Sequence, residues 1–175
     1  MKHNRRVYSP PHQVQEYNRC GIHAINNAVG DMEAVTVEKA EEMARKLEKR
    51  EANFLKIPNW APCLAMPGAN FLDVTVVMEL IRCLGYTPEL VKSFSRSFFL
   101  SKSSFYTGSV FILCSSNPYT PYALRNGVWW YHDSLEKGAR VVTQRQFLCV
   151  LSSSSICYGS TMQHGRRVIY FNKIL

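Results

Sequence analysis

The chain has 175 residues and is 46% hydrophobic and 19% charged, which is typical of one globular domain with a substantial core. Lys and Arg number 21 against 13 Asp and Glu, so the net charge is +8. No run approaches the roughly 18 apolar residues of a membrane span, and no apolar stretch follows the basic start as in a secretory signal. We therefore expect an intracellular protein of a reducing compartment, the cytoplasm first and an organelle as the alternative, with no membrane partner.

The first half of the chain predicts helices. Residues 1–12 are polar and contain proline, which indicates an extended lead-in. Apolar residues then recur at helical spacing, with Thr36 suited to N-cap the second helix, and Gly30 and Gly85 suited to end the first and third. The helices are expected over residues 20–29, 36–47 and 73–84, with a loop over residues 53–70.

The second half changes to patterns typical of strands. Apolar residues fill positions 109–114, and Asn126-Gly127 between two apolar runs predicts a tight hairpin turn. The strands are expected over residues 87–91, 109–114, 122–125, 128–133 and 167–171, with a short helix over residues 143–151. Helices followed by a mostly antiparallel sheet predict an α+β fold, in a single domain over residues 1–175.

The excess of positive charge fits two kinds of surface. It suits an acidic partner such as nucleic acid or an acidic protein face, and it also suits a solvated basic surface. The basic residues come in scattered doublets without interleaved aromatic residues, as at Arg5-Arg6, Lys49-Arg50 and Arg166-Arg167. RNA or a ribonucleoprotein is therefore one candidate partner, and we expect the chain to act as a monomer or as a subunit of a larger complex.

The six cysteines indicate a reduced protein. They are Cys20, Cys63, Cys83, Cys114, Cys149 and Cys157. None forms a C-x-x-C pair, so we expect no metal and no cofactor. A chain of this length has a core large enough to fold without disulfides. Cys83, Cys114 and Cys149 lie in apolar segments as small core residues do, whereas Cys20 has polar neighbours.

Cys20 begins the first predicted helix. The positive end of the helix dipole favours a thiolate there, which is the nucleophilic form, and Gly21 would open space for a substrate. Gln15, five residues upstream, could donate its side-chain amide to the oxyanion that forms when a thiolate attacks a carbonyl. The alternatives are a buried structural cysteine and a surface glutamine.

Three motifs in order resemble the Josephin domain, a papain-like fold of deubiquitinating cysteine proteases. The first is Gln-x4-Cys followed by a helix with His and paired Asn, which here are Gln15, Cys20, His23 and Asn26-Asn27. The second is the helix start at residues 68–78, and the third is Asp133-Ser134-Leu135. The likeness covers roughly residues 13–173. It implies N-terminal helices packed on a mostly antiparallel sheet, and ubiquitin or a ubiquitin-like protein as partner.

The resemblance assigns Asp133 as the acid that would orient the catalytic imidazole, against the alternative of an aspartate that ends a strand. His23 and Asn26-Asn27 are expected to tie the first helix to a loop by hydrogen bonds.

The histidine of the family pattern is missing from its place. The segment at residues 120–125 matches the strand that the histidine begins, and Thr120 occupies the histidine position. Threonine is no general base near neutral pH. His132 adjoins Asp133 on a strand, so their side chains should point to opposite faces. His164 would reach the site only by an unusual path.

Three interpretations follow. The chain is an active Josephin-type thiol hydrolase with an unorthodox base, a pseudoenzyme that binds ubiquitin, another protein or RNA, or a form substituted at Thr120 to trap a substrate. Because loss of a general base removes about 10²- to 10⁴-fold in rate, we expect impaired or absent hydrolysis.

Overall fold

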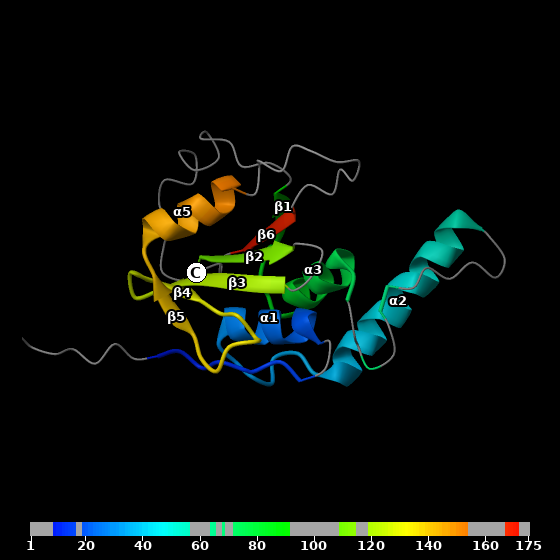
Figure 1. Cartoon of the computed structure of the whole chain (residues 1–175). Helices are drawn as coiled ribbons and strands as arrows, with labels where there is room; N and C mark the ends of the chain where they lie inside the picture. The colour runs from blue at the N-terminus through cyan, green and yellow to red at the C-terminus, as the bar shows by residue number, and fades with distance from the viewer. Residues whose placement is uncertain are drawn as a thin grey trace, which may run out of the picture.

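The computed structural model describes residues 9–16, 19–56, 64–65, 68, 72–91, 109–114, 119–153 and 167–171. Its centre is a six-stranded sheet with the strand order β1-β6-β2-β3-β4-β5, in which every neighbouring pair is antiparallel (Figure 1). The strands are β1 (Glu89–Val91), β2 (Val110–Cys114), β3 (Tyr119–Arg125), β4 (Val128–Tyr131), β5 (Arg140–Val142) and β6 (Arg167–Phe171). The helices are α1 (Cys20–Val29), α2 (Val37–Leu55), α3 (Val74–Cys83) and α5 (Gln144–Ser153).

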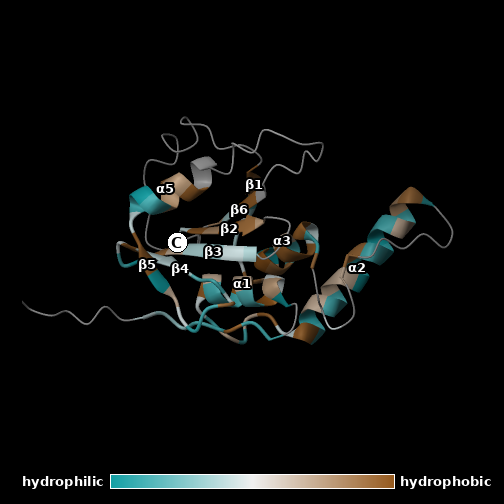
Figure 2. Ribbon diagram, in the orientation of Figure 1, coloured by the Kyte–Doolittle hydropathy of each residue, from teal (hydrophilic) through white to brown (hydrophobic). Residues whose placement is uncertain are grey.

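Strand alternation gives the sheet two apolar faces, and helices cover both. Val110, Ile112 and Ala123 pack with the core of α1 and α3, whereas Phe111 and Tyr122 pack with Phe147 of α5. Cross-strand partners share a face, so the paired register keeps the two sets apart. The sheet therefore lies between α1 on one side and α5 on the other, and β2 carries the hydrophobic colour of a buried strand in Figure 2.

The α+β class predicted from the sequence is confirmed, and so are the main helix signals. The Thr36 side chain accepts a hydrogen bond from the main-chain N–H of Lys39, and Asp73 caps α3 through the N–H of Thr75. Gly30 has a φ of 78° and ends α1. Among the described residues, none of the helices combines the length and apolar character needed to cross a membrane.

Several elements differ from the expectation. Strand β3 begins at Tyr119 rather than at residue 122. Helix α2 continues to Leu55, beyond the expected end at residue 47, although Phe54 and Leu55 are exposed, because the residues after Leu47 include good helix formers such as Glu, Lys, Arg and Ala. Strand β5 was not expected, since its three residues are mostly exposed and carry no clear alternation. Residues 1–8, most of the expected loop at 53–70, Cys63, Cys157, His3 and His164 lie outside the described residues.

Arg125 of β3 forms hydrogen bonds with the C-terminal end of α1. Its guanidinium donates to the main-chain oxygens of Asn27 and Ala28 at 2.9 and 3.0 Å, where the helix leaves carbonyl groups without intrahelical partners. Gly30 lies directly against this guanidinium, since a Cβ built on Gly30 would come within 2.5 Å of it. The absence of a side chain at Gly30 is thus required both by the backbone conformation and by Arg125.

We expect Gly30→Ala to lower the free energy of unfolding by about 3 kcal/mol, because it adds left-handed strain and displaces Arg125. Gly127→Ala is the matched control, because Gly127 has a φ of 75° but an added Cβ there would meet nothing within 4 Å. It should cost about 1 kcal/mol. Urea denaturation measures both variants, and equal losses would show that the contact with Arg125 contributes nothing.

Candidate functional site

Cys20 is the first residue of α1 and lies beside the start of β3. It is 2% exposed, and it accepts a main-chain hydrogen bond from Tyr119 that lowers the pKa of its thiol. Burial has the larger, opposite effect and raises the pKa above its usual value. The main-chain groups at the start of α1 do lower the pKa, as the helix position predicted, but desolvation outweighs them and the thiol form is favoured.

Gly21 serves packing rather than substrate access. A Cβ on Gly21 would lie 3.2 Å from the Cβ of Leu72, which is itself buried. The space next to the thiol that the glycine was expected to open is thus filled by the residue that precedes α3. The N-terminus of α1 thus packs closely against Leu72.

Gln15 is held beside the turn that follows β4. Its main-chain N–H donates to the oxygen of Ser134 at 2.6 Å, and the Ser134 hydroxyl donates to Gln15 Oε1 at 2.9 Å. The carbonyl oxygen of the Gln15 side chain thus faces Ser134, which leaves its amide nitrogen as the end that could serve an oxyanion. Ser134 follows Asp133 directly, so two of the predicted site residues meet at this turn.

The polar residues of α1 hold the segment that carries Gln15, which we call the lead-in segment (residues 9–16). The main chain of Gln13 donates to Asn27 Oδ1 at 2.5 Å and accepts from Asn27 Nδ2 at 3.1 Å. Asn26 donates to Gln13 Oε1, and His23 Nε2 accepts from the main chain of Glu16 at 3.3 Å. The expectation that His23 and Asn26-Asn27 tie the helix to a loop is confirmed.

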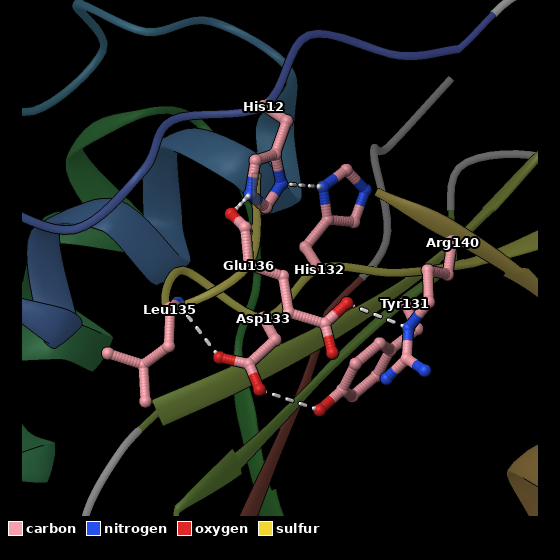
Figure 3. A network of polar contacts seen from close by, with 7 residues as sticks. All are labelled: His12, Tyr131, His132, Asp133, Leu135, Glu136 and Arg140. Carbon is pink, nitrogen blue, oxygen red and sulfur yellow. Dashed lines mark hydrogen bonds and ion pairs between the residues drawn. The ribbon is translucent and has the colours of Figure 1, made fainter. Parts of the chain in front are cut away.

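Asp133 lies just beyond the end of β4, whose last paired residue is Tyr131. The main chain of His132, between the two, donates to the oxygen of Pro121. The Asp133 carboxylate accepts from the Tyr131 hydroxyl at 3.0 Å and from the main chain of Leu135 at 2.9 Å (Figure 3). Asp133 thus directly precedes Ser134, the hydrogen-bond partner of Gln15.

His132 points the other way, as strand alternation predicted. Its ring is fully buried and stacks on His12 at 5.6 Å between centroids, whereas Asp133 turns toward Tyr131 (Figure 3). Burial, with Arg125 and His12 nearby, lowers the pKa of His132 to about 3. His132 is therefore neutral at physiological pH. Its ring contacts the lead-in segment through His12.

The structure gives the predicted residues two sets of contacts. Gln15 bonds to Ser134, the residue after Asp133, and Cys20 bonds to the main chain of Tyr119, the residue before Thr120. Sequence reasoning missed Ser134 and Tyr119. Ser134 had a signal, its place in the Asp-Ser-Leu motif, whereas Tyr119 acts through its main chain, which leaves no trace in the sequence.

The described residues include no group of three or more His, Cys, Asp or Glu side chains arranged to hold a metal ion. The chemistry that the predicted site residues offer is that of a thiol, a side-chain amide, a carboxylate and a threonine hydroxyl. A scan against protein-family models finds no family that matches the chain, and a search of curated proteins finds no match either.

Proposed function

We propose that this chain is a Josephin-like domain that binds the C-terminal tail of ubiquitin or of a ubiquitin-like protein and hydrolyses it poorly or not at all. One observation carries the proposal. Gln15 bonds to Ser134, which follows Asp133, and Cys20 bonds to the main chain of Tyr119, which precedes Thr120, while the three described histidines contact other groups. These contacts support a thiol-hydrolase site, and Thr120 at the position of the family's histidine supports the loss of its base.

Two physical effects support impaired hydrolysis. Thr120 offers no imidazole to take the proton of the thiol, and proton transfer is worth about 10²- to 10⁴-fold in rate. Burial raises the pKa of Cys20, so the thiol is protonated at neutral pH and its sulfur is a weak nucleophile. Both effects act on the same step, the attack of sulfur on the carbonyl carbon.

An active hydrolase is the second candidate, and a specific observation favours it. The side-chain oxygen of Gln15 accepts a hydrogen bond from Ser134, which fixes the side chain, and an oxyanion donor has to be preorganised in this sense. Such fixation has no evident purpose in a surface glutamine. An active enzyme would use Cys20 with a base other than Thr120.

Titration of isotope-labelled ubiquitin with the unlabelled chain, followed by nuclear magnetic resonance, tests the proposal. We expect shifts concentrated in the C-terminal tail of ubiquitin, and we expect them to weaken with ubiquitin that lacks its last two glycines. Absence of shifts at millimolar concentration would rule out the binding function.

A fluorogenic ubiquitin amide separates the two candidates. The binding module leaves it uncleaved, and the active enzyme cleaves it in a reaction that Cys20→Ala abolishes.

A further inference from the structure

The imidazole of His12 connects the lead-in segment to the turn after β4. His12 Nε2 lies 3.0 Å from the main-chain oxygen of Glu136, and His12 Nδ1 lies 3.4 Å from His132 Nδ1. A carbonyl oxygen only accepts, so His12 Nε2 carries a proton toward Glu136. The contact between the two Nδ1 atoms requires one of them to donate and the other to accept. The two contacts therefore join both rings to each other and to the turn after β4.

The surroundings of His132 disfavour a second proton on the pair. The charged or titratable groups that face it are Arg125 from β3 and His12 from the lead-in segment, and α1 adds only Cys20 and His23 as titratable groups. The carboxylate of Glu136, near His12, is paired with Arg140 at 2.8 Å. His132 Nε2 is buried and has no hydrogen-bond partner among the described residues. A second proton on the two facing Nδ1 atoms would set two N–H donors against each other.

Release of the lead-in segment would therefore take up protons. His132 has a pKa of about 3 while covered and would return toward 6.5 once its ring meets water. Because the covered state binds fewer protons between those values, a falling pH favours release through this window. For this one group the equilibrium shifts about 25-fold between pH 7 and pH 5.

We propose that His12 and His132 are positioning residues for Gln15, and that acidification releases the lead-in segment, with Gln15, from the turn at Ser134. The contacts connect these events, because Gln15 follows His12 by three residues and bonds to Ser134, two residues after His132. The effect of this release on the thiol site rests on the proposed function. The release of the lead-in segment does not depend on that function.

Amide hydrogen exchange of the Gln15 N–H at pH 7 and pH 5, corrected for intrinsic rates, measures the release. We expect protection of Gln15 to fall about 25-fold at pH 5 while the amide of Ile112 in β2 keeps its protection. His132→Phe keeps an aromatic ring against His12 and removes the titration, so protection of Gln15 should change less than threefold. His12→Phe, which removes the contact to Glu136, should lower protection at both pH values.

Three results would overturn the proposal. They are a Gln15 protection that does not depend on pH in the wild type, an equal loss in His132→Phe, and a loss shared in parallel by Ile112, which would indicate global unfolding. Reaction of Cys20 with a dipyridyl disulfide, which proceeds at acid pH, should rise with the release. If Gln15 is released but ubiquitin binds at neither pH, the proposed function fails and this inference stands.

Discussion

Replacement of Asn26 by alanine is expected to lower the free energy of unfolding by about 3 to 5 kcal/mol. The Asn26 amide donates to Met32, Val35 and Gln13 oxygens at 2.8, 3.1 and 3.0 Å, and its oxygen accepts from the main chain of Val35 at 2.9 Å. Asn26 and Val35 are buried, so no water replaces the lost partner. Asn26→Ala would leave the main-chain N–H and C=O of Val35 without these hydrogen bonds. A truncation that leaves buried polar groups unpaired lowers the free energy of unfolding more than other truncations do.

Asn27→Ala is the matched control. Asn27 has the same side chain and burial, but its hydrogen bonds go to the main-chain groups of Gln13 in the lead-in segment, which water can reach if the segment moves. We expect a cost of about 1 kcal/mol. Urea denaturation followed by the fluorescence of Trp129 and Trp130 measures both. Similar costs for the two variants would contradict the central role assigned to Asn26.

Replacement of Thr120 by histidine is expected to raise the rate of ubiquitin-amide cleavage by about 10²- to 10⁴-fold. Position 120 follows Tyr119, whose main chain hydrogen-bonds the Cys20 sulfur. On the proposed function, an imidazole at position 120 would supply the base that a thiol dyad requires. It would also lower the pKa of Cys20 by offering a positive partner.

Thr120→Gln has a comparable size without a base and should leave the rate unchanged. A second control adds Cys20→Ala to Thr120→His, which must abolish the gain. If Thr120→His folds, as the fluorescence of Trp129 reports, and remains inactive, then position 120 is not the place of the missing base.

The elements that local chemistry defines could be predicted from the sequence. Helix α1 has core spacing and a terminal glycine, and the hairpin has its Asn-Gly turn, so neighbours along the chain determine both. Strand β5 could not be predicted, because its three residues, two of them exposed, acquire their conformation only by pairing with β4. The contact of Arg125 with α1 spans 98 residues of sequence and depends on the fold alone.

The candidate site likewise has features that the sequence predicts and features that only the fold determines. The residue types and the spacing of Gln15 and Cys20 indicated a thiol site, and the motif order added Asp133. The protonation state of the thiol could not be foreseen, because the helix position and burial act in opposite directions and only the structure gives the extent of burial. The pairing of His12 with His132 joins residues 120 positions apart, and neither carries a signal by itself.

The reaction of the wild-type chain with ubiquitin that carries a C-terminal electrophile tests the central claim most directly, with adduct formation followed by intact mass. We predict that Cys20 of the wild type forms the adduct no faster than it reacts with a small alkylating reagent, and that Thr120→His forms it at least about 10²-fold faster. Rapid adduct formation by the wild type, lost in Cys20→Ala, would contradict the claim that the site at Cys20 lacks its base.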